Sequence, residues 1–577
     1  MYVPISFGFI ALLSFITIGN SEVHDVDKLQ KSKLPTIEIV VLVHPFNKVK
    51  TLPFLLGGIE QQNYPKSRIN VYFRTENILS DRDPSIVDAN ELTIQLLEKW
   101  TKNYMNVYHQ ITLDVFPIVN VEEEETEYWS KIRFKTIIAA KESSLIRARR
   151  NWVDFVLFLD ADAILTNSNV FKTFTTASGD AIVSAPMLYS LGTYSNFWAG
   201  MTDKGYYKRT DDYLEILDRR QTGDFIVPMV HSCFFIDLRK SISDHLSFVP
   251  KATYPFDDII SFAFTAQSLG INFHVDNEEI WGYLMPLVDS GQNQNFTQDL
   301  IDLELESLVE GTRFPIAHGF NDYVRYQPTD KLGVDNIYLI NLIRRPERLQ
   351  RMQNSLKVIG IEAQIWPATD GKDLSDSGLR NLGIKLIPGY LDPYHSRPMT
   401  YGEIGCFLSH FFIWQDIVNR NFSSAIVLED DVRFERNMKQ RFVDAIGEIN
   451  PDEVDFVYIG RKKQGSDNEV RITLNLVKPT YSYWTIGYFI TNKGAHKLLK
   501  AKPKERLLPV DEFLPIMYDE HTNETLKSYY PKRNLIALSF QPVLITPTHY
   551  VGDDMYVSDT EASANIQSLN HPKHNEL

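Results

Sequence analysis

Two clusters of acidic residues, each at the end of an apolar run, are the side chains of this sequence best suited to chemistry. Asp160 and Asp162 follow one run, and Glu429 and Asp431 follow another. Short apolar runs predict buried strands, and because alternate side chains of a strand point the same way, each pair of carboxylates would lie side by side. Adjacent carboxylates repel unless a cation lies between them, and oxygen ligands suit Mg²⁺, Mn²⁺ or Ca²⁺. Ligands of open α/β sheets bind at the carboxyl ends of strands, so the sequence predicts two divalent-metal sites that hold a phosphate-bearing substrate.

A second interpretation of these clusters is structural. Aspartate is common in turns and at helix N-termini, so an acidic residue after a strand need not bind anything. The recurrence of the cluster in the second half of the chain favours the metal sites.

The elements that must position the clusters alternate between strand and helix. Strands at 37–43 and 69–73 flank a helix, which makes a βαβ unit and indicates a mainly parallel sheet. The pattern restarts with a strand at 337–341, after a segment rich in Gln, Asn, Asp and Gly. We therefore predict two α/β domains of comparable size with mostly parallel central sheets, at 36–325 and 326–560.

Two expectations concern individual elements. The largely apolar stretch at 225–236 predicts strand structure in this part of the chain. A helix at 404–418 carries Phe407, Phe411 and Trp414 at helical spacing, which indicates packing in the core more simply than ligand binding.

Composition and charge exclude some partners. The chain has 577 residues, is 44% hydrophobic and carries a formal charge of -15. This charge argues against nucleic acid or an anionic membrane surface as a partner. The two cysteines are far apart in the sequence and do not form a disulfide scaffold.

Both ends of the sequence resemble targeting signals. Residues 1–21 resemble a secretory signal peptide, and a polar spacer follows at 22–35. The tail at 561–577 ends in His-Asn-Glu-Leu, a variant of the address that retains proteins in the endoplasmic reticulum. We expect a protein of the endoplasmic reticulum lumen that a retention receptor holds there and that is not inserted in the membrane once the signal peptide is removed. Three asparagines fit the N-glycan acceptor pattern: Asn295, Asn421 and Asn523.

Longer motifs are more specific than the acidic clusters. Over nearly the whole mature chain the sequence resembles glycosyltransferase family 25, in particular the animal procollagen galactosyltransferases. The segments that carry the resemblance are Asn196–Met201, Pro255–Ile259, Ile340–Leu342, Arg344–Arg348, Gly402–His410 and Pro509–Pro515.

The resemblance implies a function. It implies two tandem domains of the GT-A type, the Rossmann-like fold of nucleotide-diphospho-sugar transferases. It also implies transfer of galactose from UDP-galactose to hydroxylysine of collagen or a collagen-like polypeptide, with Mn²⁺ as the metal. Negative charge builds up on the diphosphate leaving group, and a cation held by the carboxylates would neutralise it.

A β-linked product from an α-linked donor means that the reaction inverts the sugar carbon. One carboxylate must then accept the proton of the acceptor hydroxyl on the opposite face. The candidates for this base, all in expected loops after a proline, are Asp257 and Asp258 in the first domain and Asp511 and Glu512 in the second.

Further residues would complete the two sites, and each has a structural alternative. His274 and His549 each follow an apolar strand late in their domain and would complete the metal shells. Glu76 follows the second strand, where GT-A folds often use Asp for the nucleotide base. Three arginines near the start of a helix would bind phosphate: Arg344, Arg345 and Arg348. A satisfied structural histidine or a solvated helix face explains the same residues.

Two rival functions remain at this stage. A lumenal binding or adhesion protein would keep the fold without turnover, although it would have no need of paired carboxylates at two strand ends. A glycoside hydrolase also uses two carboxylates but needs no metal or diphosphate site.

Overall fold

The computed structural model describes residues 34–564 apart from nine short segments. The segments left out are 44–48, 79–83, 119–130, 177–178, 252–256, 287–294, 466–467, 551–557 and 561–562. The predicted signal peptide and the His-Asn-Glu-Leu sequence therefore lie outside the described residues. None of the helices in the described part of the chain has the length and apolar character needed to cross a membrane.

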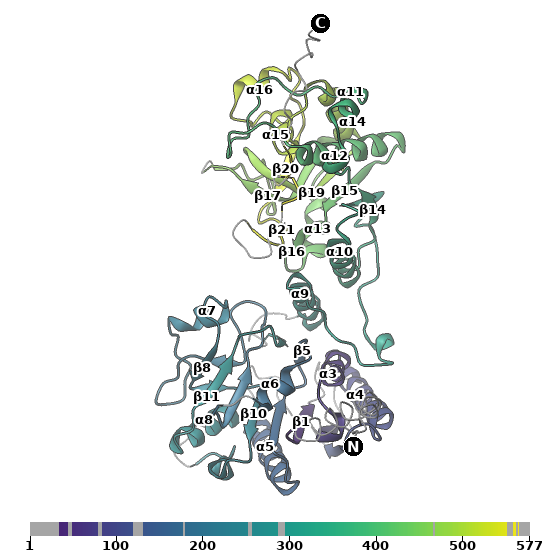
Figure 1. Cartoon of the computed structure of the whole chain (residues 1–577). Helices are drawn as coiled ribbons and strands as arrows, with labels where there is room; N and C mark the ends of the chain where they lie inside the picture. The colour runs from purple at the N-terminus through teal and green to yellow at the C-terminus, as the bar shows by residue number, and fades with distance from the viewer. Residues whose placement is uncertain are drawn as a thin grey trace, which may run out of the picture. The chain divides into compact units, whose positions relative to one another are not determined.

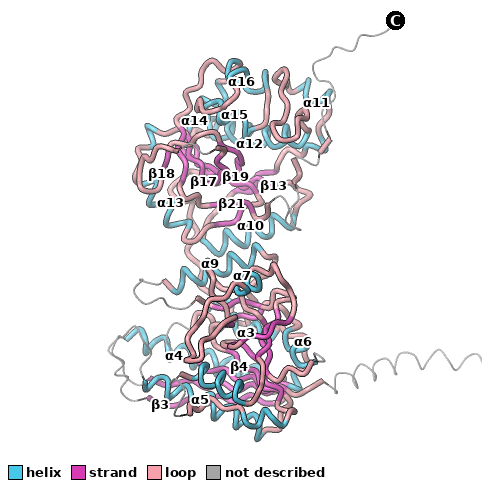
Figure 2. The backbone as a smooth tube through the Cα atoms, turned by 90° about the vertical axis from the view of Figure 1, so that its left-hand side faces the viewer, coloured by secondary structure: helices cyan, strands magenta, loops and turns pink. Residues whose placement is uncertain are grey.

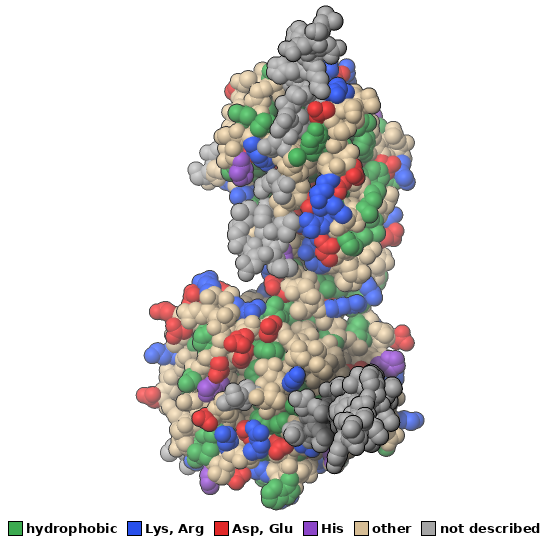
Figure 3. All heavy atoms as spheres, viewed as in Figure 1, with side chains coloured by type: hydrophobic (Ala, Val, Ile, Leu, Met, Phe, Trp, Pro, Cys, Tyr) green, Lys and Arg blue, Asp and Glu red, His purple; other side chains and the backbone are tan. Residues whose placement is uncertain are grey.

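The chain folds into two compact units (Figure 1). The first unit comprises residues 1–303 and 313–324, and the second comprises 304–312 and 325–577. The chain first passes from the first unit to the second within α9 (Phe296–Val309) and returns to the first unit at 313–324. Lys and Arg side chains are interspersed with Asp and Glu on the face of each unit seen in Figure 3.

The first unit is built on a mixed sheet of eight strands. Four parallel strands lie in the order β3-β2-β1-β4, and the order continues with β10-β6-β11-β8, in which β10 and β8 run antiparallel to their neighbours. The strands are β1 (Ile37–Val43), β2 (Ile69–Ile78), β3 (Gln110–Ile118), β4 (Phe155–Leu159), β6 (Val183–Pro186), β8 (Asp224–Val227), β10 (Cys233–Asp237) and β11 (Phe273–Asp276).

Helices cover both faces of this sheet. Phe155, Leu157 and Leu159 of β4 belong to one apolar cluster, whereas Val156 and Phe158 belong to another. Alternate residues of the same strand are thus buried on opposite faces, which explains why β4 is a continuous apolar run. The helices are α3 (Leu52–Glu60), α4 (Pro84–Tyr104), α5 (Lys131–Arg150), α6 (Val170–Thr176), α7 (Asp212–Leu217) and α8 (Asp258–Ser268).

The second unit is built on a mixed sheet of seven strands in the order β14-β13-β15-β19-β17-β20-β18. These are β13 (Asn336–Asn341), β14 (Gln364–Pro367), β15 (Ser424–Glu429), β17 (Phe456–Lys463), β18 (Leu476–Val477), β19 (Ser482–Thr491) and β20 (Ala537–Phe540). The strands, magenta in Figure 2, lie between helices (cyan) in this unit as well. The helices are α10 (Pro346–Ile359), α11 (Asp376–Asn381), α12 (Tyr401–Asn419), α13 (Met438–Gly447), α14 (Asn492–Lys500), α15 (Val510–Met517) and α16 (Glu524–Ser528).

The two units share one topology. The order β2-β1-β4-β10-β6-β11-β8 matches β14-β13-β15-β19-β17-β20-β18 in strand direction and in order along the chain, and β3 is an addition to the first unit. Each unit also has a two-stranded ribbon whose first strand directly follows the acidic cluster. The ribbons are β5 (Ala163–Leu165) with β12 (Gly282–Leu284), and β16 (Val432–Phe434) with β21 (Ile545–Pro547).

The predicted fold class of two tandem α/β domains with parallel-rich sheets is confirmed. The strand structure predicted near 225–236 is present and is divided into three short strands, β8, β9 (Met229–Val230) and β10. Pro228 has no N–H for a strand ladder, and Ser232 has a φ of 62°, so the chain changes direction twice.

Candidate active site

A pocket of about 280 Å³ lies at the carboxyl ends of the parallel strands in the second unit. Glu429 ends β15, and Asp431 follows it by two residues. Asp511 comes from the first turn of α15, and His549 follows β21. The structure thus brings four predicted residues from three separate segments around one pocket.

Burial and neighbouring carboxylates raise the pKa values of two acidic residues of this pocket, Glu429 and Asp430. Burial raises the pKa of Glu429 well above its ordinary value, and repulsion by Asp431, Asp511 and Asp430 raises it further. Burial and the neighbouring Asp431 raise the pKa of Asp430 to about 6. Arg348 offsets only part of this repulsion, and a cation between the carboxylates would offset more of it.

A second observation concerns Asp431. Its Oδ1 is buried and has no hydrogen-bond partner among the described residues, and Arg348 Nη1 lies 3.7 Å from its Oδ2. A buried carboxylate oxygen without a partner is costly unless something binds it. The residues present therefore fit a divalent cation with oxygen and imidazole ligands.

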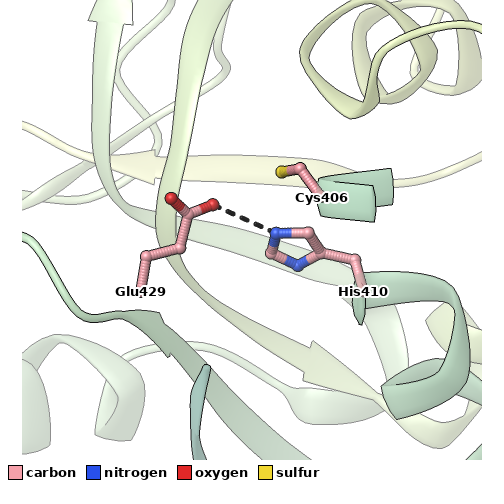
Figure 4. A group of neighbouring side chains, drawn as sticks. All are labelled: Cys406, His410 and Glu429. Carbon is pink, nitrogen blue, oxygen red and sulfur yellow. Dashed lines mark hydrogen bonds and ion pairs between the residues drawn. The ribbon is translucent and has the colours of Figure 1, made fainter. Parts of the chain in front are cut away.

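His410 is a pocket residue that the sequence analysis missed. It is 1% exposed and lies on α12, and burial lowers its pKa to about 3, so the imidazole is neutral and carries one N–H. Trp414 Nε1 donates to the Tyr488 hydroxyl at 3.0 Å, so that hydroxyl can donate to His410 Nδ1, also at 3.0 Å. The remaining N–H, on Nε2, then donates to Glu429 Oε1 at 3.1 Å (Figure 4). This chain of hydrogen bonds orients Glu429.

Cys406 lies one turn before His410 on the same helix. One ligand atom each from Cys406, His410 and Glu429 lie within 4.8 Å of one another, and the three side chains point toward one another in Figure 4. The aromatic face of α12 packs in the core as predicted, since Phe407, Phe411 and Trp414 are buried. A histidine within such an aromatic face was the signal in the sequence that could have revealed this residue.

The three predicted phosphate-binding arginines are paired with carboxylates. Asp559 accepts from Arg344 Nη1 at 2.6 Å and from Arg345 at 2.7 and 2.9 Å, and it lies 3.7 Å from Arg348. Arg344 also donates to Asp370 at 2.6 Å. Arg344 and Arg348 line the pocket. Phosphate binding by these residues stays a prediction.

The segment that carries Asp559 packs against the start of α12. Thr400 Oγ1 donates to the carbonyl of Thr560 at 2.7 Å, and the amide of Gly402 donates to Ser563 Oγ at 2.8 Å. A methyl group at Gly402 would lie 2.7 Å from the carbonyl oxygen of Asp559 and 2.8 Å from Thr560 Cα. Only glycine allows this close approach.

Gly402→Ala is therefore expected to destabilise the second unit by about 1–3 kcal/mol, because the new methyl group collides with backbone atoms. Thermal unfolding of the full chain measures the effect. Gly447→Ala is the matched control, since a methyl group there meets no atom within 4 Å, and it is expected to leave stability unchanged or raise it by up to ~1 kcal/mol. Equal unfolding temperatures for the two variants would contradict the close packing of this segment.

Glu512 does not share the pocket with its neighbour Asp511. Its carboxylate is buried and accepts from the hydroxyls of Tyr481 and Tyr483 and contacts His521 Nε2. Both acidic residues lie in the first turn of α15 rather than in a loop, where the helix dipole favours negative charge. Consecutive helical side chains point in different directions, so only Asp511 faces the pocket.

In the first unit, Asp160 and Asp162 directly follow β4 as predicted. Asp257 and Asp258 lie at the start of α8 rather than in a loop, and the Asp257 side chain caps the helix by accepting from the amide of Ile260 at 2.9 Å. Asp258 is paired with Lys141 at 2.5 Å, and both side chains are buried. Glu76 is half-buried on β2 and pairs in register with Phe116 of β3.

His274 is not positioned to complete a metal shell with Asp160 and Asp162. In the sheet register it is level with Leu157 of β4 and lies three strands away from it, which is roughly 14 Å at the usual strand spacing. Its Nδ1 is 2.7 Å from Asp224 Oδ2 on the edge strand β8. The prediction of His274 as a metal ligand is corrected on this ground.

Comparisons with known proteins match both units. Residues 34–305 match the model of the glycosyltransferase family 25 N-terminal domain, and residues 334–514 match that of glycosyltransferase family 25 (LPS biosynthesis protein). A glycosyltransferase 25 family member of Aedes aegypti is 41% identical over 548 residues, 93% of this chain and 88% of the relative. Human procollagen galactosyltransferase 2 is 42% identical over 542 residues, 92% of this chain and 84% of the relative. A solved mannosyltransferase of Pyrobaculum calidifontis in complex with GDP-Man and Mn²⁺ is 13% identical over 51% of this chain and 72% of its own, with a TM-score of 0.27, too low to support an argument.

Proposed function

The chain belongs to glycosyltransferase family 25, and from this premise we propose that it transfers galactose from UDP-galactose to hydroxylysine of collagen, in the pocket of the second unit. The observation that carries the proposal is the convergence of Glu429, Asp431, Asp511 and His549 on that pocket. Relatives that are named procollagen galactosyltransferases, at 39–42% identity over 92% of the chain, support the choice of sugar and acceptor.

Glu429, Asp431 and His549 would hold Mn²⁺ in this pocket. When bound, the ion would neutralise the negative charge that develops on the leaving diphosphate. The raised pKa of Glu429 and the unsatisfied oxygen of Asp431 support a cation at this place. His410 keeps Glu429 in position by donating its N–H to the carboxylate.

Asp511 is the general base of the proposed reaction. It accepts hydrogen bonds from the amide of Trp484 at 3.2 Å and from the Thr485 hydroxyl, and these bonds fix the carboxylate against the pocket wall. Burial raises its pKa to about 6 despite these two bonds. At neutral pH it is ionised and still basic enough to accept the proton of the hydroxylysine hydroxyl.

We expect the purified chain to form UDP from UDP-galactose only when both Mn²⁺ and a hydroxylysine-bearing collagen peptide are present. UDP release measures the reaction, and chelation of the metal is expected to stop it. The matched control is the same peptide with lysine in place of hydroxylysine, which lacks the accepting hydroxyl. Absence of UDP release from every sugar nucleotide tried would instead favour a catalytically silent binding protein.

The proposed setting is the lumen of the endoplasmic reticulum. The three acceptor asparagines, Asn295, Asn421 and Asn523, are exposed, as N-glycosylation requires. Asn523 also caps α16 through its side-chain oxygen, which leaves its amide nitrogen available for a glycan.

A further inference from the structure

The shared topology relates the proposed metal-binding positions of the second unit to positions in the first unit. Asp162 directly precedes β5, and Asp431 directly precedes β16. Each accepts, through its carbonyl oxygen, a hydrogen bond from the residue directly after the ribbon's second strand: Met285 at 3.1 Å in the first unit and Thr548 at 2.8 Å in the second. The next residue is Pro286 in the first unit, where the second unit has His549. The imidazole thus has no counterpart at this position.

The counterpart of His410 can be identified by comparing the helices that precede the acidic strands, α5 and α12. Both α5 and α12 end five residues before the first residue of the strand, β4 or β15. His410 lies 19 residues before Glu429, and Lys141 lies 19 residues before Asp160, which is the counterpart of Glu429. Lys141 therefore occupies the place of His410.

The two residues make different contacts in their sites. His410 donates a hydrogen bond to Glu429 at 3.1 Å, whereas Lys141 carries an ammonium group that is 2.5 Å from Asp258. The side chains of Lys141 and Asp258 are 8% and 6% exposed, so this ion pair is shielded from water. Burial lowers the pKa of Lys141, but attraction by Asp258, then by Asp160 and Asp257, raises it above its ordinary value. The Lys141 ammonium is therefore charged, and Asp160 is near enough to attract it.

We propose that the Lys141 ammonium supplies, in the first unit, the positive charge that a divalent cation would supply in the second, so that the Asp160–Asp162 cluster does not bind Mn²⁺ and the chain has one manganese site. This inference rests on the proposed function for the metal site of the second unit. A cation at Asp160 would be repelled by the ammonium, and Pro286 offers it no side-chain ligand where the second unit has His549. The expectation of two equivalent metal sites does not fit the residues present in the first unit.

The test is the number of Mn²⁺ ions bound by the full chain, measured by the loss of the electron paramagnetic resonance signal of free Mn²⁺. The wild-type chain is expected to bind one ion. Glu429→Gln with Asp431→Asn is expected to remove it, and Asp160→Asn with Asp162→Asn is expected to leave it in place.

Variants at the lysine test the cause directly. Lys141→His places the residue of the second unit in the first and is expected to create a second Mn²⁺ site. Its Mn²⁺ affinity is expected to be about a hundredfold higher than that of the wild-type first unit, because one unit charge at close range changes the affinity for a divalent ion by about this factor. Removal of the lysine alone leaves Asp258 buried without its partner, so Lys141→Met with Asp258→Asn is the second variant, which removes both charges together. Thermal unfolding establishes that each variant is folded.

Two bound ions in the wild type, one of them lost in Asp160→Asn with Asp162→Asn, would overturn the inference. So would folded lysine variants that bind no additional ion. A wild-type chain that binds no Mn²⁺ would contradict the metal site of the proposed function instead. The first-unit inference would then be decided by whether the lysine variants gain an ion.

Discussion

Glu429→Gln with Asp431→Asn is expected to lower kcat for galactose transfer by about a thousandfold, because stabilisation of a leaving diphosphate by a bound metal contributes several kcal/mol to the transition state. Both substitutions keep the size of the side chain and remove its charge. They also remove the burial of charge and the repulsion between carboxylates that together raise the pKa of Glu429, so the variant is expected to be at least as stable as the wild type. UDP formation at saturating donor and acceptor measures the loss.

The matched control for this variant is Asp444→Asn with Glu448→Gln, at and just beyond the end of α13. These two residues are exposed and lie in the same unit, so the control removes the same charge away from the pocket. It is expected to leave kcat within about twofold of the wild type. A pocket variant as active as this control would show that the acidic cluster does not contribute to catalysis.

Asp511→Asn is expected to lower kcat by about 10²–10⁴-fold with little change in the KM for UDP-galactose, because a general base acts on the acceptor rather than on the donor. The side-chain carbonyl of asparagine can still accept from the amide of Trp484, so the first turn of α15 is expected to keep its position against β19. Steady-state kinetics with each substrate varied in turn separate the two parameters.

The dependence of kcat on pH identifies the general base independently of how far Asp511→Asn lowers kcat. The pKa of Asp511 is raised to about 6 by burial, so in the wild type the ionised form, and with it kcat, is present above about pH 6 and is lost as the pH falls below it. Asp511→Asn is expected to abolish this acidic limb. Glu505→Gln, at an exposed residue of the same segment, is the control and is expected to retain the limb. If kcat of the Asp511→Asn variant still fell below about pH 6, the acidic limb would belong to the titration of another group.

Much of the fold was predictable from the sequence because its signals are local. The apolar run of β4 and the restart of the pattern at β13 depend on residues that are neighbours along the chain, and two tandem α/β domains follow from them. The division of the stretch at 225–236 into three strands also has a local cause, since Pro228 cannot donate to a strand ladder.

The candidate site was predictable only in part. Glu429 and Asp431 could be paired from the sequence because a strand end places alternate residues on one side. Asp511 and Glu512 could not be separated, since the choice depends on how α15 is rotated against the sheet. His410 was missed because its face of α12 is otherwise aromatic, and only the position of Tyr488 on the neighbouring strand shows that it is part of a hydrogen-bond chain.

By itself the sequence determined the two α/β units, the acidic strand ends and the family, because periodicity and short motifs are set by residues a few positions apart. Only the tertiary structure decided that His549 and Asp511 reach the acidic cluster of β15, that His274 does not reach that of β4, and that Lys141 stands where the other unit has His410. The physical reason is that these relations depend on strand order and register, which bring together side chains from distant parts of the chain and leave no periodic trace in the sequence.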